Sequence, residues 1–333
     1  AYKLCPLYEN DLEFGAGPPS ISTLSRVPCA PTLSDSEVEV SCVIMDNSTI
    51  QEDLIHYSVD GGDYLSVSMT SNGDSTFTGI VPVFEGNTIY YYITATDDGT
   101  DQAEPKTSVY PYDIDHDQLG FHVTDDLTVE TVQETPWPSG NSLYEGCTVT
   151  LTGVVTADTA QYASSYSSYS LQDGDGQWDG IIFDLPVGAT EPAIMTRGDE
   201  VTVTGLITDN DPDWTFKFAG NTRLINASVE VGSAVGEPTP AVVSCEDVHQ
   251  IADEVESYEG VLVQLNNVTV SAVNDFDWAI TDETGFEALI DDDMANKRQD
   301  DEAADGRAPK RHRIHTSPSA SRCLLYTSPS PRD

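Results

Sequence analysis

Basic side chains are scarce in this sequence. Its 333 residues contain 14 Lys and Arg against 57 Asp and Glu, a formal net charge of −43. Eight of the 14 basic residues follow residue 294, so residues 1–294 carry six basic and 52 acidic side chains. Such a surface repels the phosphates of nucleic acids and of anionic membranes. The same acidity also suits a protein that must stay soluble in salty water, so the charge alone assigns no function.

Several sequence signals of other protein classes are missing. No apolar run is long enough to span a membrane. Long patterns with the period of an α-helix are absent, and so are C-x-x-C zinc spacing, phosphate loops, nucleophile elbows and His-Glu-x-x-His. We therefore predict no catalytic centre within this chain. The chain begins with Ala1 and shows no signal peptide, so we expect the natural N-terminus to lie upstream.

The sequence is rich in Thr, Ser, Val, Tyr, Gly and Asp, a composition typical of all-β proteins. After a linker at residues 15–19, short apolar-polar alternations recur with turn signals such as Asp60-Gly-Gly62 and Asn72-Gly-Asp74. The alternations predict strands at 20–26, 37–44, 53–59, 64–70, 75–81 and 88–96. This spacing favours a β-sandwich over residues 19–112.

The last of these strands carries a family resemblance. Gly86-Asn-Thr-Ile-Tyr-Tyr-Tyr-Ile-Thr-Ala-Thr-Asp-Asp98 resembles the penultimate strand of fibronectin type III and bacterial Ig-like modules. Tyr91, Ile93 and Ala95 match the inward positions of that strand. The resemblance implies that Tyr91 is the corner tyrosine, whose hydroxyl bonds back to the backbone.

A repeat follows the predicted sandwich. Residues 143–157 and 257–272 align at an offset of 114, with Tyr-Glu-Gly at Tyr144 and at Tyr258. Both copies alternate like a half-buried strand, and both break at a residue that tolerates positive φ, Gly153 or Asn267. Together with Gly198-Asp-Glu-Val-Thr-Val-Thr-Gly205, the first copy resembles the OB-fold domains that accompany secreted bacterial nucleases and other extracellular hydrolases. The resemblance implies a five-stranded barrel with a long, bent first strand.

The second copy loses its β pattern after Met294. The following residues turn basic, and Cys323-Leu-Leu-Tyr-Thr-Ser-Pro-Ser-Pro-Arg-Asp333 resembles a translated sequencing adapter. A natural basic tail for nucleic acid, or a nuclear localisation signal at Lys310-Arg-His-Arg313, is the other interpretation. The expected order is the end of a preceding module (1–18), an Ig/fibronectin-like β-sandwich (19–112), a linker (113–126), an OB-fold-like barrel (127–236), a truncated second OB-like repeat (237–294) and a disordered tail (295–333).

Candidate ligand-binding side chains are aromatic. OB-folds bind oligonucleotides or sugars on one face of the barrel, where rings can stack on the ligand. In the first barrel these candidates are Tyr162, Tyr166, Tyr169, Trp178 and Trp214. Ordinary packing of the same rings is the alternative. Because Lys and Arg are so few, a glycan or a protein is favoured over nucleic acid.

Aspartates at alternate positions indicate a candidate calcium loop at Asp113, Asp115 and Asp117, because calcium prefers several carboxylate oxygens. The loop departs from the EF-hand pattern, with Gln118 where Gly belongs, and a solvated turn is the alternative. We expect no other cofactor. With Cys323 set aside, Cys5, Cys29, Cys42, Cys147 and Cys245 allow two disulfides, Cys29–Cys42 and Cys147–Cys245, or simply small buried side chains.

The sequence therefore predicts non-catalytic spacer or binding modules of a larger secreted or surface-attached bacterial protein, with a glycan, a protein or calcium as ligand. The alternative is the accessory region of a secreted nuclease, phosphoesterase or protease whose catalytic domain lies outside this chain.

Overall fold

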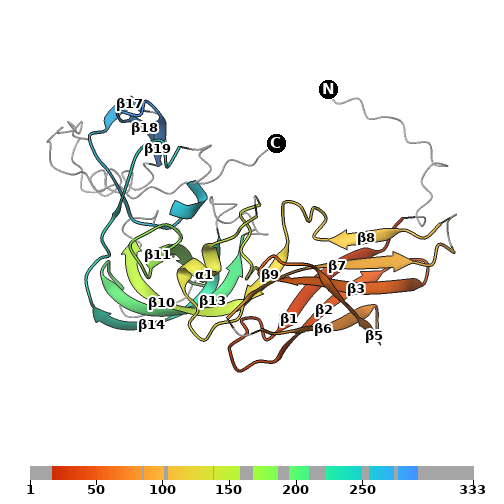
Figure 1. Cartoon of the computed structure of the whole chain (residues 1–333). Helices are drawn as coiled ribbons and strands as arrows, with labels where there is room; N and C mark the ends of the chain where they lie inside the picture. Colours follow the sequence, from red (N-terminus) through yellow and green to blue (C-terminus); the bar gives the residue numbers. More distant parts are fainter. Residues whose placement is uncertain are drawn as a thin grey trace, which may run out of the picture. The chain divides into compact units, whose positions relative to one another are not determined.

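The computed structural model describes residues 17–84, 86–100, 104–137, 139–157, 168–186, 195–209, 222–249, 255–273 and 277–291. Over these described residues the protein is mostly β, with 52% strand and one short α-helix. The described residues divide into two compact units (Figure 1), the first extending to residue 125 and including 137 and 139, and the second comprising those of 126–136 and 140–291. Each unit is described by itself below.

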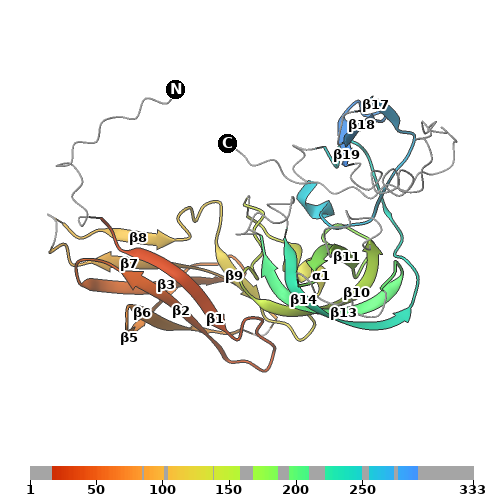
Figure 2. The same ribbon diagram turned by 180° about the vertical axis from the view of Figure 1, so that it is seen from behind.

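The first unit consists of two sheets. Its strands are β1 (Ser20–Val27), β2 (Glu37–Met45), β3 (Ile50–Val59), β4 (Leu65–Ser68), β5 (Thr70–Gly73), β6 (Thr76–Pro82), β7 (Thr88–Asp97), β8 (Thr107–Tyr110) and β9 (Leu119–His122). One sheet has the order β1-β2-β6-β5, and the other has β4-β3-β7-β8 with β9 also paired to β7. Both sheets can be followed in Figure 2. The alternation in β7 buries Ile89, Tyr91, Ile93 and Ala95 in the core, which confirms the inward positions predicted for Tyr91, Ile93 and Ala95.

The chain crosses from one sheet to the other at Met69. Sequence patterning predicts one strand over residues 64–70, but β4 pairs with β3 while β5 pairs with β6. Met69 between them is 7% exposed, and its N–H donates to the carbonyl of Asp53 at 3.0 Å. Its side chain belongs to the core cluster of the unit, so burial of this one apolar residue marks the crossing.

Two further expectations for this unit differ from the structure. The expected linker over residues 113–126 contains β9, and its Phe121 is fully buried in the core. Four residues are too few for alternation to reveal a strand. The Tyr91 hydroxyl is buried, and no backbone group of the described residues hydrogen-bonds to it. The polar group that faces it is the guanidinium of Arg26, which lowers the pKa of Tyr91 against the larger raising effect of burial.

The second unit contains a closed five-stranded barrel. Its strands are β10 (Thr148–Ala157), β11 (Ser168–Gln172), β12 (Gly180–Asp184), β13 (Asp199–Thr208) and β14 (Arg223–Ala234), bonded in the order β10-β11-β12-β14-β13. The contact between β12 and β14 is parallel, and the other contacts are antiparallel. Strand β10 bonds to β13 through Thr148–Val154 and to β11 through Val154–Ala157, and its pairing with β11 is irregular between Val155 and Ala157.

Gly153 lies in β10 for a reason that the sequence does not reveal. Its φ is not positive, so the expected positive φ is wrong here. A Cβ on Gly153 would lie 2.8 Å from the carbonyl oxygen of Gln172 on β11, so the close approach of two strands requires glycine. At the matching place in the second copy, Asn267 does adopt a φ of 55°.

The second repeat does not form one long strand. Its elements are β15 (Ala241–Val243), the 3-10 helix η1 (Val255–Tyr258), β16 (Val263–Leu265), β17 (Thr269–Val273), β18 (Asp277–Thr281) and β19 (Glu287–Asp291). Where one strand over 258–272 is predicted, β16 pairs in parallel with β15, and β17 begins a separate sheet with β18 and β19. The break falls at Asn266–Val268, around the positive φ of Asn267.

A capped turn precedes each copy of the repeat, and the alignment of the two copies does not reveal it. Before the first copy, the hydroxyl of Thr128 accepts the N–H of Thr131, at the start of helix α1 (Val129–Gln133), and Asp173 accepts the N–H of Val129 at 2.7 Å. Before the second copy, the hydroxyl of Ser244 accepts the N–H of Asp247 at 3.4 Å. There Asp282 accepts the N–H of Cys245 at 2.7 Å. The structural repeat therefore includes a hydroxyl cap and an aspartate that holds it.

Candidate ligand-binding face

The aromatic residues predicted for the barrel are only partly described. Tyr162, Tyr166 and Trp214 lie outside the described residues. Tyr169 lies on β11, is 2% exposed and stacks on Phe183 with ring centroids 5.2 Å apart, so it is a core residue. Trp178 is half-buried with a φ of 65°. Its backbone N–H donates to the carbonyl of Ser257 at 2.6 Å, which places it at the start of the second repeat.

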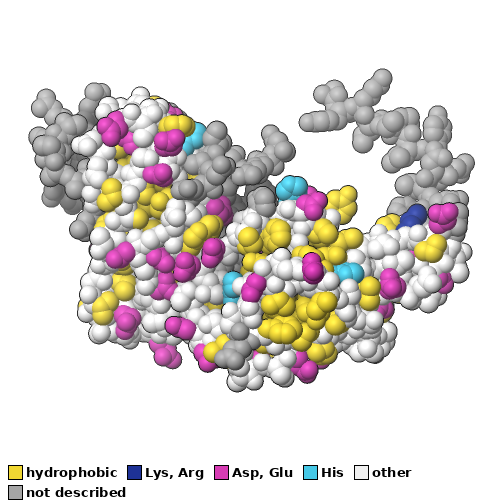
Figure 3. All heavy atoms as spheres, viewed as in Figure 1, with side chains coloured by type: hydrophobic (Ala, Val, Ile, Leu, Met, Phe, Trp, Pro, Cys, Tyr) yellow, Lys and Arg dark blue, Asp and Glu magenta, His cyan; other side chains and the backbone are white. Residues whose placement is uncertain are grey.

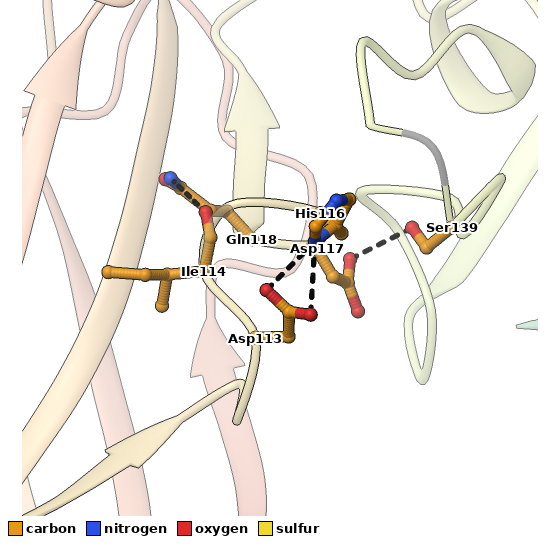
Figure 4. A network of polar contacts seen from close by, with 6 residues as sticks. All are labelled: Asp113, Ile114, His116, Asp117, Gln118 and Ser139. Carbon is orange, nitrogen blue, oxygen red and sulfur yellow. Dashed lines mark hydrogen bonds and ion pairs between the residues drawn. The ribbon is translucent and has the colours of Figure 1, made fainter.

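The candidate calcium loop lies between β8 and β9 (Figure 4). The Nδ1 atom of His116 is 3.0 Å from each carboxylate oxygen of Asp113, whereas Asp117 accepts the hydroxyl of Ser139 at 3.1 Å. The hydrogen bond from His116 lowers the pKa of Asp113, and the same bond raises the pKa of His116. In the described part of the chain, no three His, Cys, Asp or Glu side chains are grouped so as to hold a metal ion. Calcium binding by Asp113, Asp115 and Asp117 stays a prediction.

The cysteines pair differently from expectation. Cys29 and Cys147 are each disulfide-bonded, whereas Cys42 and Cys245 are free and buried, so both expected pairs are wrong. Cys42 points into the core of the first unit, where burial and the charge of Asp53 raise its pKa to about 11. Burial and the charge of Asp282 raise the pKa of Cys245 to about 11 as well. Cys5 lies outside the described residues.

A set of aromatic rings lies on the outer face of the β4-β3-β7 sheet, a surface that we call the aromatic face. It consists of His56, Tyr64, Tyr90, Tyr92 and Trp137. Residues on a strand alternate between its two sides, so burial of Ile55, Tyr57, Tyr91 and Ile93 directs their neighbours outward. Figure 3 shows hydrophobic side chains gathered over the part of the molecule that carries β3, β7 and β9 in the same view.

The rings of the aromatic face form two groups of contacts, one of His56, Tyr64 and Tyr92 and the other of Tyr90 and Trp137. His56 and Tyr92 are cross-strand partners, and their rings stack with centroids 4.6 Å apart and planes 17° apart. Tyr64, which is 42% exposed, tilts against Tyr92 at 5.2 Å. The rings of Trp137 and Tyr90 meet in a T-shaped contact with centroids 5.7 Å apart. Such contacts orient the rings relative to one another.

Polar groups surround these rings. The two ring nitrogens of His56 lie 2.9 Å from the hydroxyls of Ser66 and Thr94, and the Tyr64 hydroxyl donates to Gln118. Partial burial lowers the pKa of His56, so its ring is neutral at neutral pH. Only Arg26 and Lys106 are basic among the described residues of this unit, and Arg26 is buried. The face therefore offers rings and hydrogen-bonding groups with little positive charge.

Sequence reasoning missed this face although the signal was present. In the predicted strand, the inward assignment of Tyr91 already directs Tyr90 and Tyr92 to the opposite side. Their neighbours His56, Tyr64 and Trp137 come from other segments, and only strand pairing brings them together.

Comparisons with known proteins add no family. Neither the known protein-family models nor the curated proteins give a match to this chain. In the ranges that the structure describes, no helix has the length and apolar character needed to cross a membrane.

Proposed function

We propose that this chain consists of non-catalytic modules of a secreted bacterial protein, and that the aromatic face of the first unit binds a neutral glycan. The observation that carries the proposal is the stack of His56 on Tyr92, flanked by Tyr64. Aromatic rings pack against the apolar faces of sugar rings, and nearby hydroxyl and amide groups bond to sugar hydroxyls.

Charge supports a neutral ligand over an anionic one. The chain carries a net charge of −43, and His56 contributes no positive charge at neutral pH. Nucleic acid and acidic polysaccharides would meet electrostatic repulsion over most of the surface.

The arrangement of strands supports the module types that the sequence resembles. In Ig-like sandwiches, the first, second, fourth and fifth strands form one sheet in the order ABED, and strands C, F and G form the other. Here β1-β2-β6-β5 has that order, and β3, β7 and β8 take the places of C, F and G. The five-stranded ring β10-β11-β12-β14-β13 supports an OB-like barrel.

The cysteines support secretion. Disulfides persist in oxidising compartments such as the extracellular space and the bacterial periplasm. The disulfide-bonded state of Cys29 and Cys147 is consistent with such a compartment.

Affinity electrophoresis tests the glycan proposal. The full chain is run in native gels that contain arabinoxylan, galactomannan or hydroxyethyl cellulose. Retardation in at least one gel is expected, with about tenfold weaker binding for Tyr92→Ala, which corresponds to about 1.4 kcal/mol.

Tyr112→Ala is the matched control, because Tyr112 is 96% exposed and lies outside the aromatic face. Circular dichroism establishes that both variants are folded. Equal retardation of Tyr92→Ala and Tyr112→Ala, or retention of the wild type on single-stranded DNA instead of glycan, would contradict the proposal.

A further inference from the structure

The start of the second repeat docks against the barrel formed by the first. The N–H of Trp178 donates to the carbonyl of Ser257 at 2.6 Å, and the N–H of Leu262 donates to the side chain of Gln172 at 2.8 Å. Between these bonds, Gly180 and Gly260 touch so closely that a Cβ on Gly180 would lie 2.3 Å from the backbone of Gly260. Residues 255–262 are thus fixed to the ends of β11 and β12.

This docking buries Glu259. Its side chain is 4% exposed, and one carboxylate oxygen accepts the N–H of Thr222 at 3.3 Å. The other oxygen, Oε1, is buried without a hydrogen bond among the described residues. A buried carboxylate with so few donors is costly to keep ionised.

The first copy provides an internal comparison. Glu145 occupies the matching place in its own Tyr-Glu-Gly turn, yet it is exposed. The turns themselves are alike, because Gly146 has a φ of 77° and Gly260 a φ of 68°. Burial of Glu259 therefore comes from docking onto the barrel and is not a property of the turn.

The charges that face Glu259 are mostly negative. Glu256 lies on η1, three residues earlier, and Asp209 follows β13. Asp209 is itself 5% exposed and accepts the N–H of Ser142 at 2.9 Å and the hydroxyl of Thr222. Among the described residues, the cation that faces Glu259 is Arg223 of β14, which lies 2.9 Å from Asp184 in an ion pair only 2% exposed on each side.

We propose that Glu259 is a proton-dependent latch, which holds the first turn of the second repeat against the barrel when it is protonated and loosens that contact when it ionises. Burial is the main cause that raises the pKa of Glu259 well above 4.5, followed by the charges of Glu256 and Asp209. The N–H of Thr222 and the charge of Arg223 act in the opposite direction but more weakly.

The sign of the pH effect follows from linkage. An acid whose pKa is higher in the docked state binds its proton more tightly there. Docking is therefore strongest at and below pH 4.5, the ordinary value for Glu, and weakens as the pH rises through the higher pKa of the docked state.

Hydrogen exchange measured by mass spectrometry tests the latch on the full chain. Peptides covering residues 255–262 are compared between wild type and Glu259→Gln at equal pH, from about pH 5 to about pH 8, so that intrinsic exchange cancels. The wild-type peptides are expected to exchange progressively faster than those of Glu259→Gln as the pH rises. Glu145→Gln, the matched control at the exposed glutamate, is expected to behave as the wild type.

Two further measurements keep the test decisive if Glu259→Gln does not fold. In Glu256→Gln, one of the charges that oppose ionisation is removed, so the loss of protection with pH is expected to shrink. A carbon-13 NMR titration of the wild type is expected to place the Glu259 carboxyl midpoint above 4.5. A midpoint at or below 4.5, or a wild-type to Glu259→Gln exchange ratio that is constant with pH, would overturn the proposal.

Discussion

The imidazole of His56 lies parallel to the ring of Tyr92 across two neighbouring strands, with 4.6 Å between centroids. The partial burial of this pair lowers the pKa of His56. The imidazole is therefore neutral at neutral pH. The glycan binding that we propose for this face would therefore depend on the protonation of His56.

We expect glycan binding by the aromatic face to be constant above pH 6.5 and to weaken below it. A His whose pKa is lowered on folding is stabilised in its neutral form, and protonation below its unfolded value of 6.5 opposes the folded arrangement. The dissociation constant measured by titration calorimetry from about pH 5 to about pH 8 checks this. His122 also has a lowered pKa, so the difference between wild type and His56→Gln is the quantity to follow. A difference that does not change with pH would disagree with the prediction.

The exposed pair of His116 and Asp113 is expected to affect titration and to contribute little to stability. The hydrogen bond from His116 to Asp113 raises the pKa of His116. Asp113→Asn is therefore expected to move the His116 midpoint back toward 6.5 in an NMR titration. Asp117→Asn is the matched control, because Asp117 bonds to Ser139. Equal shifts in the two variants would show that the pairing is not what raises the pKa.

Calcium binding at the same loop has a separate test. If Asp113, Asp115 and Asp117 bind the ion together, Asp113 and Asp117 must leave His116 and Ser139, and calcium must raise the melting temperature relative to a chelator. Asp115→Asn should abolish that rise, since Asp115 lies between the two paired aspartates. Identical melting temperatures in calcium and in chelator would remove calcium from the list of ligands.

Gly180→Ala is expected to destabilise the second unit by at least about 2 kcal/mol, because its Cβ would overlap the backbone of Gly260. Gly176→Ala is the matched control in the same connection, where the nearest atom to a Cβ is a carboxylate oxygen of Asp179 at 3.3 Å. Urea unfolding measures both free energies. Similar values for the two variants would mean that the Gly180–Gly260 approach is looser than described.

Strand periodicity predicted much of the β framework but not its connections. The alternation over Thr88–Thr96 predicted β7, which spans Thr88–Asp97, to within one residue. The pattern is clear because one side of that strand is buried in the core. The crossing at Met69 and strand β9 were not predicted, because each depends on pairing with a strand far away in the sequence. The repeated Tyr-Glu-Gly turn could be recognised in the sequence. The different burial of Glu145 and Glu259 could not, because it depends on which residues each turn contacts.

The candidate site, too, could be predicted only in part, because its residues meet only through strand pairing. The sequence presented Tyr169 as a ligand contact, yet it stacks on Phe183 inside the barrel. A tyrosine on a strand looks the same from either side until the pairing of the strands is known. The rings of the aromatic face come from separate segments, so no local pattern joins them.

The hydroxyl caps before the two copies determine where a segment of this chain must begin if it is to be transferred to another protein. An excision that begins at Tyr144 would separate Asp173 from the amide of Val129 that it binds, and one that begins at Tyr258 would do the same to Asp282 and Cys245. Gene segments meant for grafting onto other proteins should therefore begin no later than Thr128 for the first copy. For the second copy they should begin no later than Ala241, which keeps both the cap at Ser244 and the pairing of β15 with β16.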